Sequence, residues 1–243
     1  HVKTETVGHD SLRVVGNNHD IKIELDAFEH IFNDQSVSIG GNEEVTVSHN
    51  RFKEVKQSET ISVGGNRTIS TGVMHNLSAK YKRTLSVGGS VIEAAKGSVG
   101  MTVGKNFDVM IGGAEFKASQ MSIAEDVGKE STQIIGGARI EIAAQNMPTD
   151  VGEKYEETVL GTMSLQTDEA FIDGAEKTAK WEVGSAISGQ APKVFVEARD
   201  KIQIKCGSSV ITILPDSIEI SSPSLDLTGA TQLKVVTQTV DHN

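Results

Sequence analysis

The sequence predicts an all-β fold wound from short, nearly identical strands, and three repeating features carry this prediction. Half of the 24 glycines lie at positions divisible by eight. Val or Ile stands immediately before most of those positions. Doubled glycines begin every 24 residues, at Gly40-Gly41, Gly64-Gly65, Gly88-Gly89, Gly112-Gly113 and Gly136-Gly137. Such regular self-similarity identifies a repeat architecture, here with a unit of eight residues, an octad.

Each octad is predicted to hold one short strand and one corner. The residue before the glycine column is β-branched, as at Val63 and Val87, and another apolar residue often stands two positions earlier. Alternation with a period of two, carried by β-branched residues, indicates a strand with one buried face. Asn, Asp or Ser commonly follows two positions after the glycine, as at Asn42 and Asn66, which favours a turn. Three octads then make one 24-residue turn of a three-sided prism.

Such short strands cannot bury their apolar face alone, so they must stack on other strands. If one chain stacks on itself, each turn rises by one strand spacing of about 4.8 Å. If three chains intertwine, each turn rises by about three spacings, roughly 14 Å. The turns through Gly184 would then span about 40 Å for one chain and about 110 Å for three intertwined chains. The repetition alone favours neither arrangement.

The first part of the chain, residues 1–72, carries many charged residues, which we expect on the outer face. Mixed charges on outward positions form ladders and discourage edge pairing. The residues concerned are Lys3, Glu5, Arg13, Glu43, Arg51, Lys53, Glu54 and Glu59. Between residues 73 and 96, lysine replaces glycine at Lys80 and Lys96, but Gly88 returns in phase, so the period is kept.

The later part of the chain departs from the octad in two places. The phase blurs at residues 167–174, and we expect a wider rung that includes Trp181. Beyond Gly189 longer alternating runs are separated by Pro215 and Pro223, which indicates a different β arrangement. We therefore predict an octad-repeat β-helix shaft over residues 1–189, a closing β-prism section over 190–229 and a polar C-terminal tail over 230–243.

Charge and cysteine content argue against several functions. A net charge of -10 disfavours nucleic acid as a partner. The single cysteine, Cys206, cannot form an internal disulfide. It alternates with Ile202 and Ile204, so we expect it to act as a small buried hydrophobic residue. No apolar run approaches the length of a membrane span, and the first residues lack a signal-peptide pattern.

No catalytic, cofactor-binding or metal site is predicted. Adjacent residues of a strand point to opposite faces, so paired acids do not converge. These pairs are Glu43-Glu44, Glu156-Glu157 and Asp168-Glu169. The internal histidines His9, His19, His30, His49 and His75 lack the spacing typical of metal ligands. The octad also lacks the Gly-x-Asp motif of calcium-binding β-rolls, and neither a nucleophile elbow nor a phosphate-binding loop is present.

Several strings resemble the octad repeat of the VgrG family, the spikes of the bacterial type VI secretion system, and of related contractile phage tail spikes. The octad strings are Ser38-Ile39-Gly40-Gly41-Asn42, Ser62-Val63-Gly64-Gly65-Asn66 and Ser86-Val87-Gly88-Gly89-Ser90. The segment from Lys201 to Ser209 and the runs that follow it resemble the section that closes the VgrG needle. The resemblance implies a homotrimer whose chains intertwine into a triple-stranded β-helix.

The resemblance also implies a mechanical function and a set of partners. A trimeric needle would pierce target envelopes without being an enzyme and would carry secreted effectors. A PAAR-repeat protein would cap its C-terminal end, and the Hcp tube would bind through an N-terminal region absent from this sequence. The spike would be assembled in the bacterial cytoplasm and secreted without a signal peptide. We expect the chain to be a C-terminal fragment. Some phage spikes end in a His-x-His iron site, whereas this chain has one histidine near its end, His242, so we expect no metal at the tip.

The alternative is a single-chain parallel β-helix, such as an adhesin stalk or a polysaccharide-active enzyme. Single-chain helices usually vary their loops from side to side, whereas all three sides are equal here. An enzyme would also need a loop with clustered acids or bases, and the octads offer none. The mass and shape of the protein in solution separate the two architectures.

Overall fold

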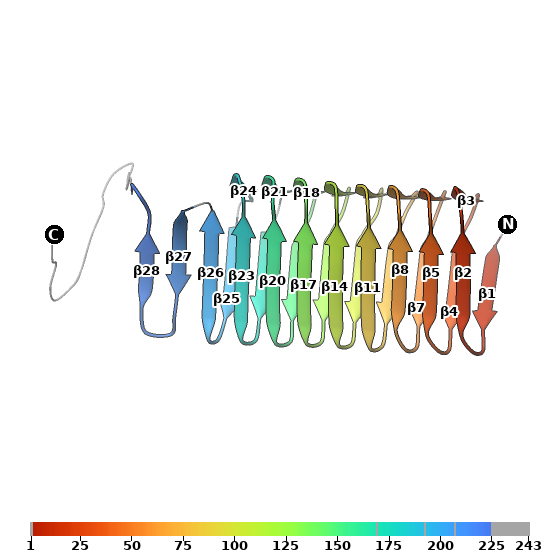
Figure 1. Ribbon diagram of the computed structural model, residues 1–243, viewed down its shortest axis with the longest axis horizontal. Coiled ribbons are helices and arrows are strands. Elements are labelled where there is room, and N and C mark those ends of the chain that lie inside the picture. Colours follow the sequence, from red (N-terminus) through yellow and green to blue (C-terminus); the bar gives the residue numbers. More distant parts are fainter. Residues whose placement is uncertain (1, 169, 192, 207, 225–243) are drawn as a thin grey trace, which may run out of the picture.

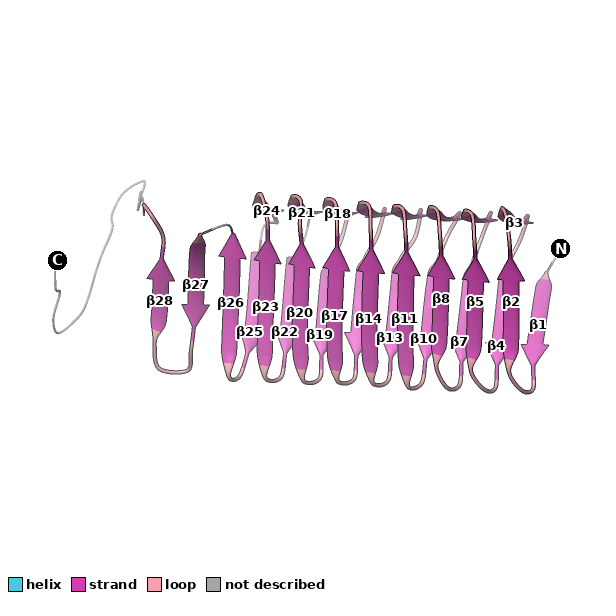
Figure 2. Cartoon of the chain, viewed as in Figure 1, coloured by secondary structure: helices cyan, strands magenta, loops and turns pink. Residues whose placement is uncertain are grey.

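The computed structural model describes residues 2–168, 170–191, 193–206 and 208–224. These residues fold into three mainly parallel β-sheets that form a three-sided prism (Figures 1 and 2). The prediction of an all-β fold is confirmed. No helix in these ranges is long and apolar enough to cross a membrane.

We call the three sheets faces A, B and C. Face A has nine strands: β1 Lys3–Val7, β4 Ala27–Ile31, β7 Arg51–Val55, β10 His75–Ala79, β13 Val99–Val103, β16 Ile123–Val127, β19 Met147–Val151, β22 Ala170–Ala175 and β25 Lys193–Ala198. Face B has eleven strands: β2 Ser11–Val15, β5 Gln35–Ile39, β8 Glu59–Val63, β11 Lys82–Val87, β14 Asn106–Ile111, β17 Glu130–Ile135, β20 Lys154–Val159, β23 Thr178–Val183, β26 Lys201–Cys206, β27 Ser209–Ile213 and β28 Ile218–Ser221. Face C has eight strands: β3 His19–Ile23, β6 Glu43–Val47, β9 Arg67–Thr71, β12 Val91–Ala95, β15 Glu115–Ser119, β18 Arg139–Ala143, β21 Met163–Thr167 and β24 Ile187–Gln190.

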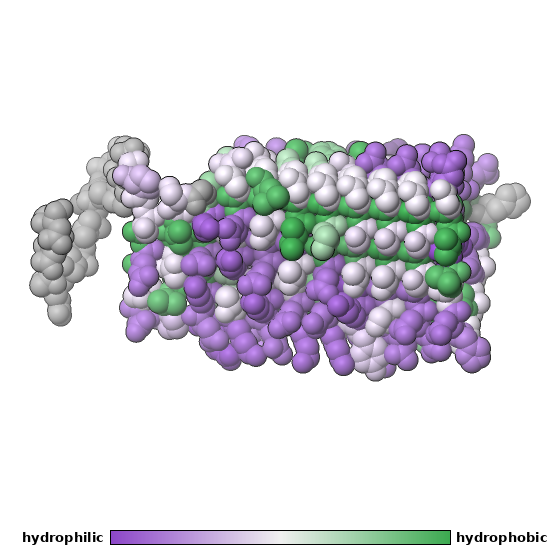
Figure 3. Space-filling view, in the orientation of Figure 1, coloured by the Kyte–Doolittle hydropathy of each residue, from purple (hydrophilic) through white to green (hydrophobic). Residues whose placement is uncertain are grey.

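Each strand of the octad region pairs in parallel with the strand three places later in the chain, so one coil of the prism takes three octads. Ile39 of β5 lies beside Val63 of β8, and Val63 lies beside Val87 of β11. Figure 3 shows the outside of face B as pale rows of weakly polar residues along the long axis, with strongly hydrophilic residues along one edge. In this structure a single chain therefore forms all three walls of the prism.

The corners explain the glycine column and the residue two positions after it. A Cβ atom on Gly88 would lie 2.4 Å from the carbonyl oxygen of Gly64, one coil away, so a side chain does not fit there. The Asn42 side chain accepts a hydrogen bond from the backbone amide of Asn66 at 2.9 Å. Asn66 accepts one from the backbone amide of Ser90 at the same distance. Glycine permits close stacking of the corners, and the Asx side chains satisfy their backbone amides.

The charged residues of the first part of the chain are not all on the outer face, which corrects the prediction. Glu43, Arg51, Lys53 and Glu59 are buried and point into the prism, whereas Glu54 points outward. A five-residue strand turns its first, third and fifth residues to the same side. The buried Val or Ile occupies the fifth position, so charged residues at the first and third positions also face inward. In the first coil Lys3 is exposed, and Glu5 and Arg13 are half-buried.

The prism changes towards its C-terminal end. β22 still pairs with β19 at the offset of three octads, in the region where the sequence blurs. The next coil is one residue shorter, because Ala179 of β23 pairs with Ile202 of β26. Face C ends at β24, and face B continues with the antiparallel strands β27 and β28. Trp181 fills the interior near this end, edge-on to Tyr155 at 5.5 Å between ring centroids.

Two other expectations about this end have different outcomes. Cys206 is half-buried, not buried, and its Sγ lies 3.4 Å from the carbonyl oxygen of Ser185. The reason is that face C does not extend over β26. The division at residues 189 and 229 stays a prediction, and residues 225–243, which include the tail, lie outside the described part of the chain.

Candidate functional site: a charged interior and an outer groove

Ionisable side chains line the inside of the prism and are the feature that distinguishes this β-helix from a purely apolar one. We call the buried members of this set the inner charges. They are Glu43, Arg51, Lys53, Glu59, Arg67, His75, Arg83, Glu115, Lys117, Glu125, Arg139, Glu141, Glu157 and Asp173. A buried charge is costly unless a partner and hydrogen bonds compensate it, so each of these groups needs an explanation.

Glu59 shows how the inner charges of the N-terminal half are compensated. Its Oε2 accepts a hydrogen bond from Nε of Arg83 at 2.8 Å, one coil away. Its Oε1 lies 2.6 Å from Nζ of Lys53. Burial alone would raise the pKa of the Glu59 carboxyl, but the two cations hold that pKa well below its usual value. Glu43 pairs with Arg67 in the same way, again across one coil.

His75 is completely enclosed and uses both ring nitrogens. Its Nε2 lies 2.8 Å from a guanidinium nitrogen of Arg51, and its Nδ1 contacts the carboxylate of Glu93. Arginine can only donate, so Nε2 must accept and the proton resides on Nδ1. Burial, together with the charges of Arg51 and Arg67, lowers the pKa of His75 despite the nearby Glu93. His75 is therefore a neutral link in a hydrogen-bonded chain.

The inner charges of the C-terminal half are organised around Lys117 and Arg139. The Lys117 ammonium lies 3.2 Å from Glu115, 2.7 Å from Glu125 and 3.2 Å from Glu141. Arg139 donates to Glu141 at 2.9 Å and also contacts Glu157. Burial raises the pKa of the Glu115 carboxyl, although both cations oppose this. Acids outnumber bases in this half of the interior.

Asp173 is the inner charge farthest along the chain. Burial raises the pKa of its carboxyl to about 8, even though Thr149 and Arg139 favour the ionised form. Its Oδ1 has no hydrogen-bond partner among the described residues. Asp173 is therefore protonated at neutral pH, which reduces the excess of negative charge inside the prism.

The interior around the inner charges has no room for a substrate. The cavity beside Glu93, Glu115, Lys117 and Glu125 has a volume of about 30 Å³, close to that of one water molecule. Within the described ranges, no three or more His, Cys, Asp or Glu side chains are arranged to hold a metal ion.

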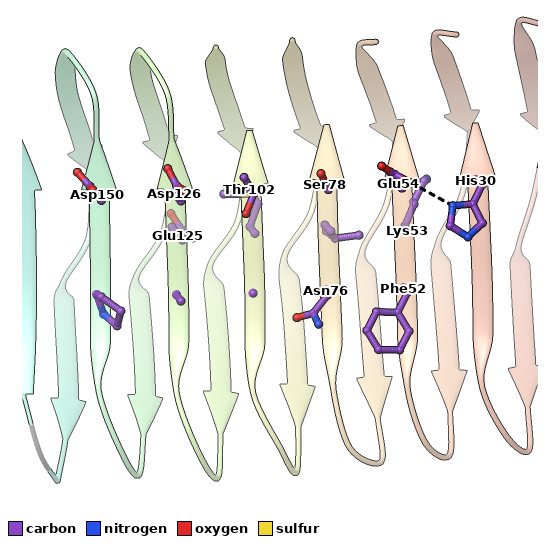
Figure 4. A pocket seen from close by; sticks show the side chains of 15 residues that line it. His30, Phe52, Lys53, Glu54, Asn76, Ser78, Thr102, Glu125, Asp126 and Asp150 are labelled. Atoms are coloured by element: carbon purple, nitrogen blue, oxygen red, sulfur yellow. Dashed lines mark hydrogen bonds and ion pairs between the residues drawn. The ribbon is translucent and has the colours of Figure 1, made fainter. Parts of the chain in front are cut away.

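The outside of face A carries a shallow groove of about 520 Å³ (Figure 4). It exists because the outward row contains small residues, Gly100 and Ala124, between the larger Phe52 and Pro148. A parallel row of polar side chains runs along it, formed by His30, Glu54, Ser78, Thr102, Asp126 and Asp150. Nδ1 of His30 lies 3.2 Å from a carboxylate oxygen of Glu54 in this row. The groove is a regular surface of a stacked sheet without a convergent set of reactive groups.

The structure separates the acid pairs that were considered as catalytic candidates. Glu43 is buried and Glu44 is exposed, and Glu157 is buried while Glu156 is partly exposed. In the third pair, Glu169 lies outside the described residues. His9, His30 and His49 are exposed and His19 is half-buried, so they are separated from the enclosed His75.

Sequence analysis missed the inner charges as a set. The signal that could have found them is position within the octad. Every inner charge stands two or four residues before a position of the buried Val or Ile column, as Lys53 and Arg51 do relative to Val55. Residue type alone predicts the outer face for these charges, whereas the alternation of the strand assigns their positions to the interior.

Comparison with known proteins gives a match to one family model. Residues 3–96 match the model described as the bacteriophage T4 gp5 C-terminal trimerisation domain. This range extends from β1 to β12 and covers less than half of the chain. Neither the curated proteins nor the solved structures contain a match to this chain. The N-terminal part is thus similar to the β-helix of a contractile phage spike.

Proposed function

We propose that this chain is the shaft of a homotrimeric, VgrG-like spike that pierces a target envelope for a type VI secretion machine. The match of residues 3–96 to a phage spike trimerisation domain carries the proposal. Three similar walls without elaborated loops support a mechanical role and not a catalytic one. A PAAR-repeat tip protein, secreted effectors and the Hcp tube are the proposed partners. Assembly in the bacterial cytoplasm and export without a signal peptide belong to the same proposal.

The proposed trimer keeps every octad but changes the neighbour of each strand. In the structure, a residue stacks on the residue 24 positions later in the same chain. In three intertwined chains, each level of the prism would contain one strand from each copy. Each octad would carry a chain to the next face and up by one strand. A residue would therefore stack on the residue eight positions later in a neighbouring copy. Inward and outward positions stay the same in both windings, because both offsets are multiples of the octad.

The outside of face C supports the three-chain winding. β12, β15 and β18 lie side by side and turn only apolar side chains outward, while charged side chains point inward. The outward side chains are Ile92, Ala94, Phe116, Ala118, Ile140 and Ile142, and the three isoleucines are exposed. A contiguous apolar patch on a soluble body is an association hazard.

An offset of eight residues would disperse this patch. Ile92 would lie between Thr84 and Gly100, two outward residues of other strands. Phe116 would lie between Asp108 and Ala124, and Ile140 between Thr132 and Pro148. The row of Ile92, Phe116 and Ile140 would therefore be interrupted in three intertwined chains, although Ile142 would lie beside Ile134.

Light scattering coupled to small-angle X-ray scattering tests the proposal. The trimer predicts a mass about threefold the 25.9 kDa of the chain and a longest dimension of about 110 Å or more. A monomer with a longest dimension between about 40 Å and about 60 Å would contradict it.

A single-chain β-helix, such as an adhesin stalk or a polysaccharide-active enzyme, is the second candidate. The observation that favours it is the pairing of each strand with the strand three octads away in the same chain. Binding of polysaccharides to the outer groove of a monomer would support it, and the same scattering experiment separates the candidates.

A further inference from the structure

Four inner charges of the N-terminal half, Glu43, Arg51, Glu59 and Arg67, alternate in sign along the octads. We propose that this alternation fixes the register in which copies of this chain associate. The partner is a second copy of the same chain, and the recognition surface is its inward column of charges. The inference rests on the proposed trimer and adds to it the side chains that select the alignment of the three chains.

The alternation is visible at the first position of successive strands. Glu43 is followed by Arg51, Glu59 and Arg67, each eight residues after the last. All four side chains are buried. Gln35 precedes this run and His75 follows it, so a neutral group stands at each end. We call the four residues Glu43, Arg51, Glu59 and Arg67 the charge column.

The alternation satisfies both possible windings. Because one coil is three octads, an odd number, first-position residues one coil apart also have opposite signs, as the Glu43–Arg67 pair shows. In three intertwined chains the rings at successive levels would be Glu43, Arg51, Glu59 and Arg67. Each ring of like charges would then lie between neutral rings or rings of opposite sign.

The apolar column cannot set the register by itself. Ile39, Val47, Val55 and Val63 are nearly equivalent, so a slip of one octad would exchange one β-branched residue for another and keep every glycine corner. Pairing without distinct side chains is prone to slippage. In the charge column, by contrast, the same slip places Glu beside Glu and Arg beside Arg in a buried site, which is strongly unfavourable.

The neutral ends act against a slip of two octads, which would restore most of the alternation inside the column. A copy that slips in this way stacks at an offset of three octads on one neighbour, so its Arg51 would face Ala27 on that side and an acid, Glu43, on the other. In the unslipped trimer the same arginine lies between Glu43 and Glu59. The loss of one of the two acids beside a buried arginine opposes this slip as well.

Two variants of identical composition test the inference, both in a Lys53→Gln and Arg83→Gln background, because Lys53 and Arg83 bind the Glu59 carboxylate in the wild type. The inverted variant carries Glu43→Arg, Arg51→Glu, Glu59→Arg and Arg67→Glu and keeps the alternation. The blocked variant carries only Arg51→Glu and Glu59→Arg, so that two acids are followed by two bases. Both retain two acids and two bases in the charge column, so net charge and composition do not differ between the two variants.

Register is read from engineered disulfides in a Cys206→Ser background, alongside the mass from light scattering. Val55→Cys with Val63→Cys links neighbouring copies only when strands one octad apart are adjacent. Ile39→Cys with Val63→Cys links one chain to itself when strands three octads apart are adjacent. Adjacent strands place such positions within the Cα separation that a disulfide spans.

The inverted variant is expected to form trimers and the 55–63 link as the wild type does. The blocked variant is expected to lose the linked trimer by about tenfold or more, since like charges would be buried together. Trimers and 55–63 links formed equally by the blocked variant would overturn the inference but leave the proposed function intact. Failure of the inverted variant would also overturn the inference. A monomeric wild type with only the 39–63 link would instead overturn the proposed function.

Discussion

Nε of Arg83 donates a hydrogen bond to Oε2 of Glu59 across 2.8 Å inside the prism, one coil apart. Lys53 holds the other oxygen of the same carboxylate. The pair is fully enclosed, so it depends on its partners and not on water for compensation. Breaking a buried pair from one side leaves an uncompensated charge, which is more damaging than losing an exposed pair.

Arg83→Ala is therefore expected to lower the free energy of unfolding by about 3–5 kcal/mol. The matched control is Lys82→Ala on the same strand, which removes an exposed pair with Asp108 and is expected to cost less than about 1 kcal/mol. Denaturant unfolding followed by circular dichroism measures both. Equal losses for the two variants would show that the interior pair is not enclosed.

Asp173 predicts a dependence of stability on pH. Its carboxyl has a pKa raised to about 8 in the folded chain, above its ordinary value. The folded state therefore binds more protons than the unfolded state between about pH 4 and pH 8, and this contribution to stability falls as pH rises through that window. Asp173→Asn removes the ionisation and is expected to flatten the decline, with a gain on the order of a few kcal/mol at pH 8 to 9.

Thermal unfolding at a series of pH values measures this effect. The control is Asp150→Asn, which changes an outward carboxylate on the neighbouring strand of face A. A slope in Asp173→Asn that matches the wild type would exclude Asp173 as the source of the dependence.

The glycine corners predict a sharp contrast between two alanine substitutions. Gly88→Ala would place a Cβ 2.4 Å from the carbonyl oxygen of Gly64, whereas a Cβ on Gly16 would have nothing within 4 Å. We expect Gly88→Ala to destabilise the fold by about 1–3 kcal/mol, because the backbone must shift to relieve the contact. Gly16→Ala should be close to neutral. Thermal unfolding measures both variants. A larger loss of stability for Gly16→Ala than for Gly88→Ala would contradict this packing of the corners.

Ile111 and Met110 test the inward assignment of the Val and Ile column. They are neighbours on β14, and Ile111 is 1% exposed while Met110 is 58% exposed. Ile111→Asp buries an unpaired carboxylate, at a cost of several kcal/mol, and is expected to prevent assembly. Met110→Asp should assemble normally. Light scattering of the two purified variants gives the result, and normal assembly of Ile111→Asp would refute the assignment.

The local structure could be predicted because each octad contains the residues that define one strand and one corner. Val63 and Gly64 together specify a buried strand end and a corner without room for a side chain. Asn66 completes the corner through its hydrogen bond to the next coil. Strand, corner and three-sided coil could all be predicted from such short-range signals.

The charged interior could not be recognised from residue type alone. Arg67 and Glu43 are residue types that usually lie on the surface, yet the alternation of the strand turns both side chains into the prism. Only the identity of the partner decides whether such a position is tolerable, and the partner lies a full coil away in the chain. The sequence pattern also does not distinguish one chain from three, because offsets of one octad and of three octads preserve the same pattern of inward and outward residues.

Because strands pair at a constant offset of three octads, the length of the shaft can change while the fold stays the same. Duplication or deletion of one three-octad segment would change the length by about 4.8 Å in one chain, or about 14 Å in three intertwined chains. The chemistry of each corner and strand would stay the same, because each coil contacts copies of the same unit. Unequal recombination between the near-identical glycine corners could therefore adjust the reach of the protein in whole coils, without the need to evolve a new fold.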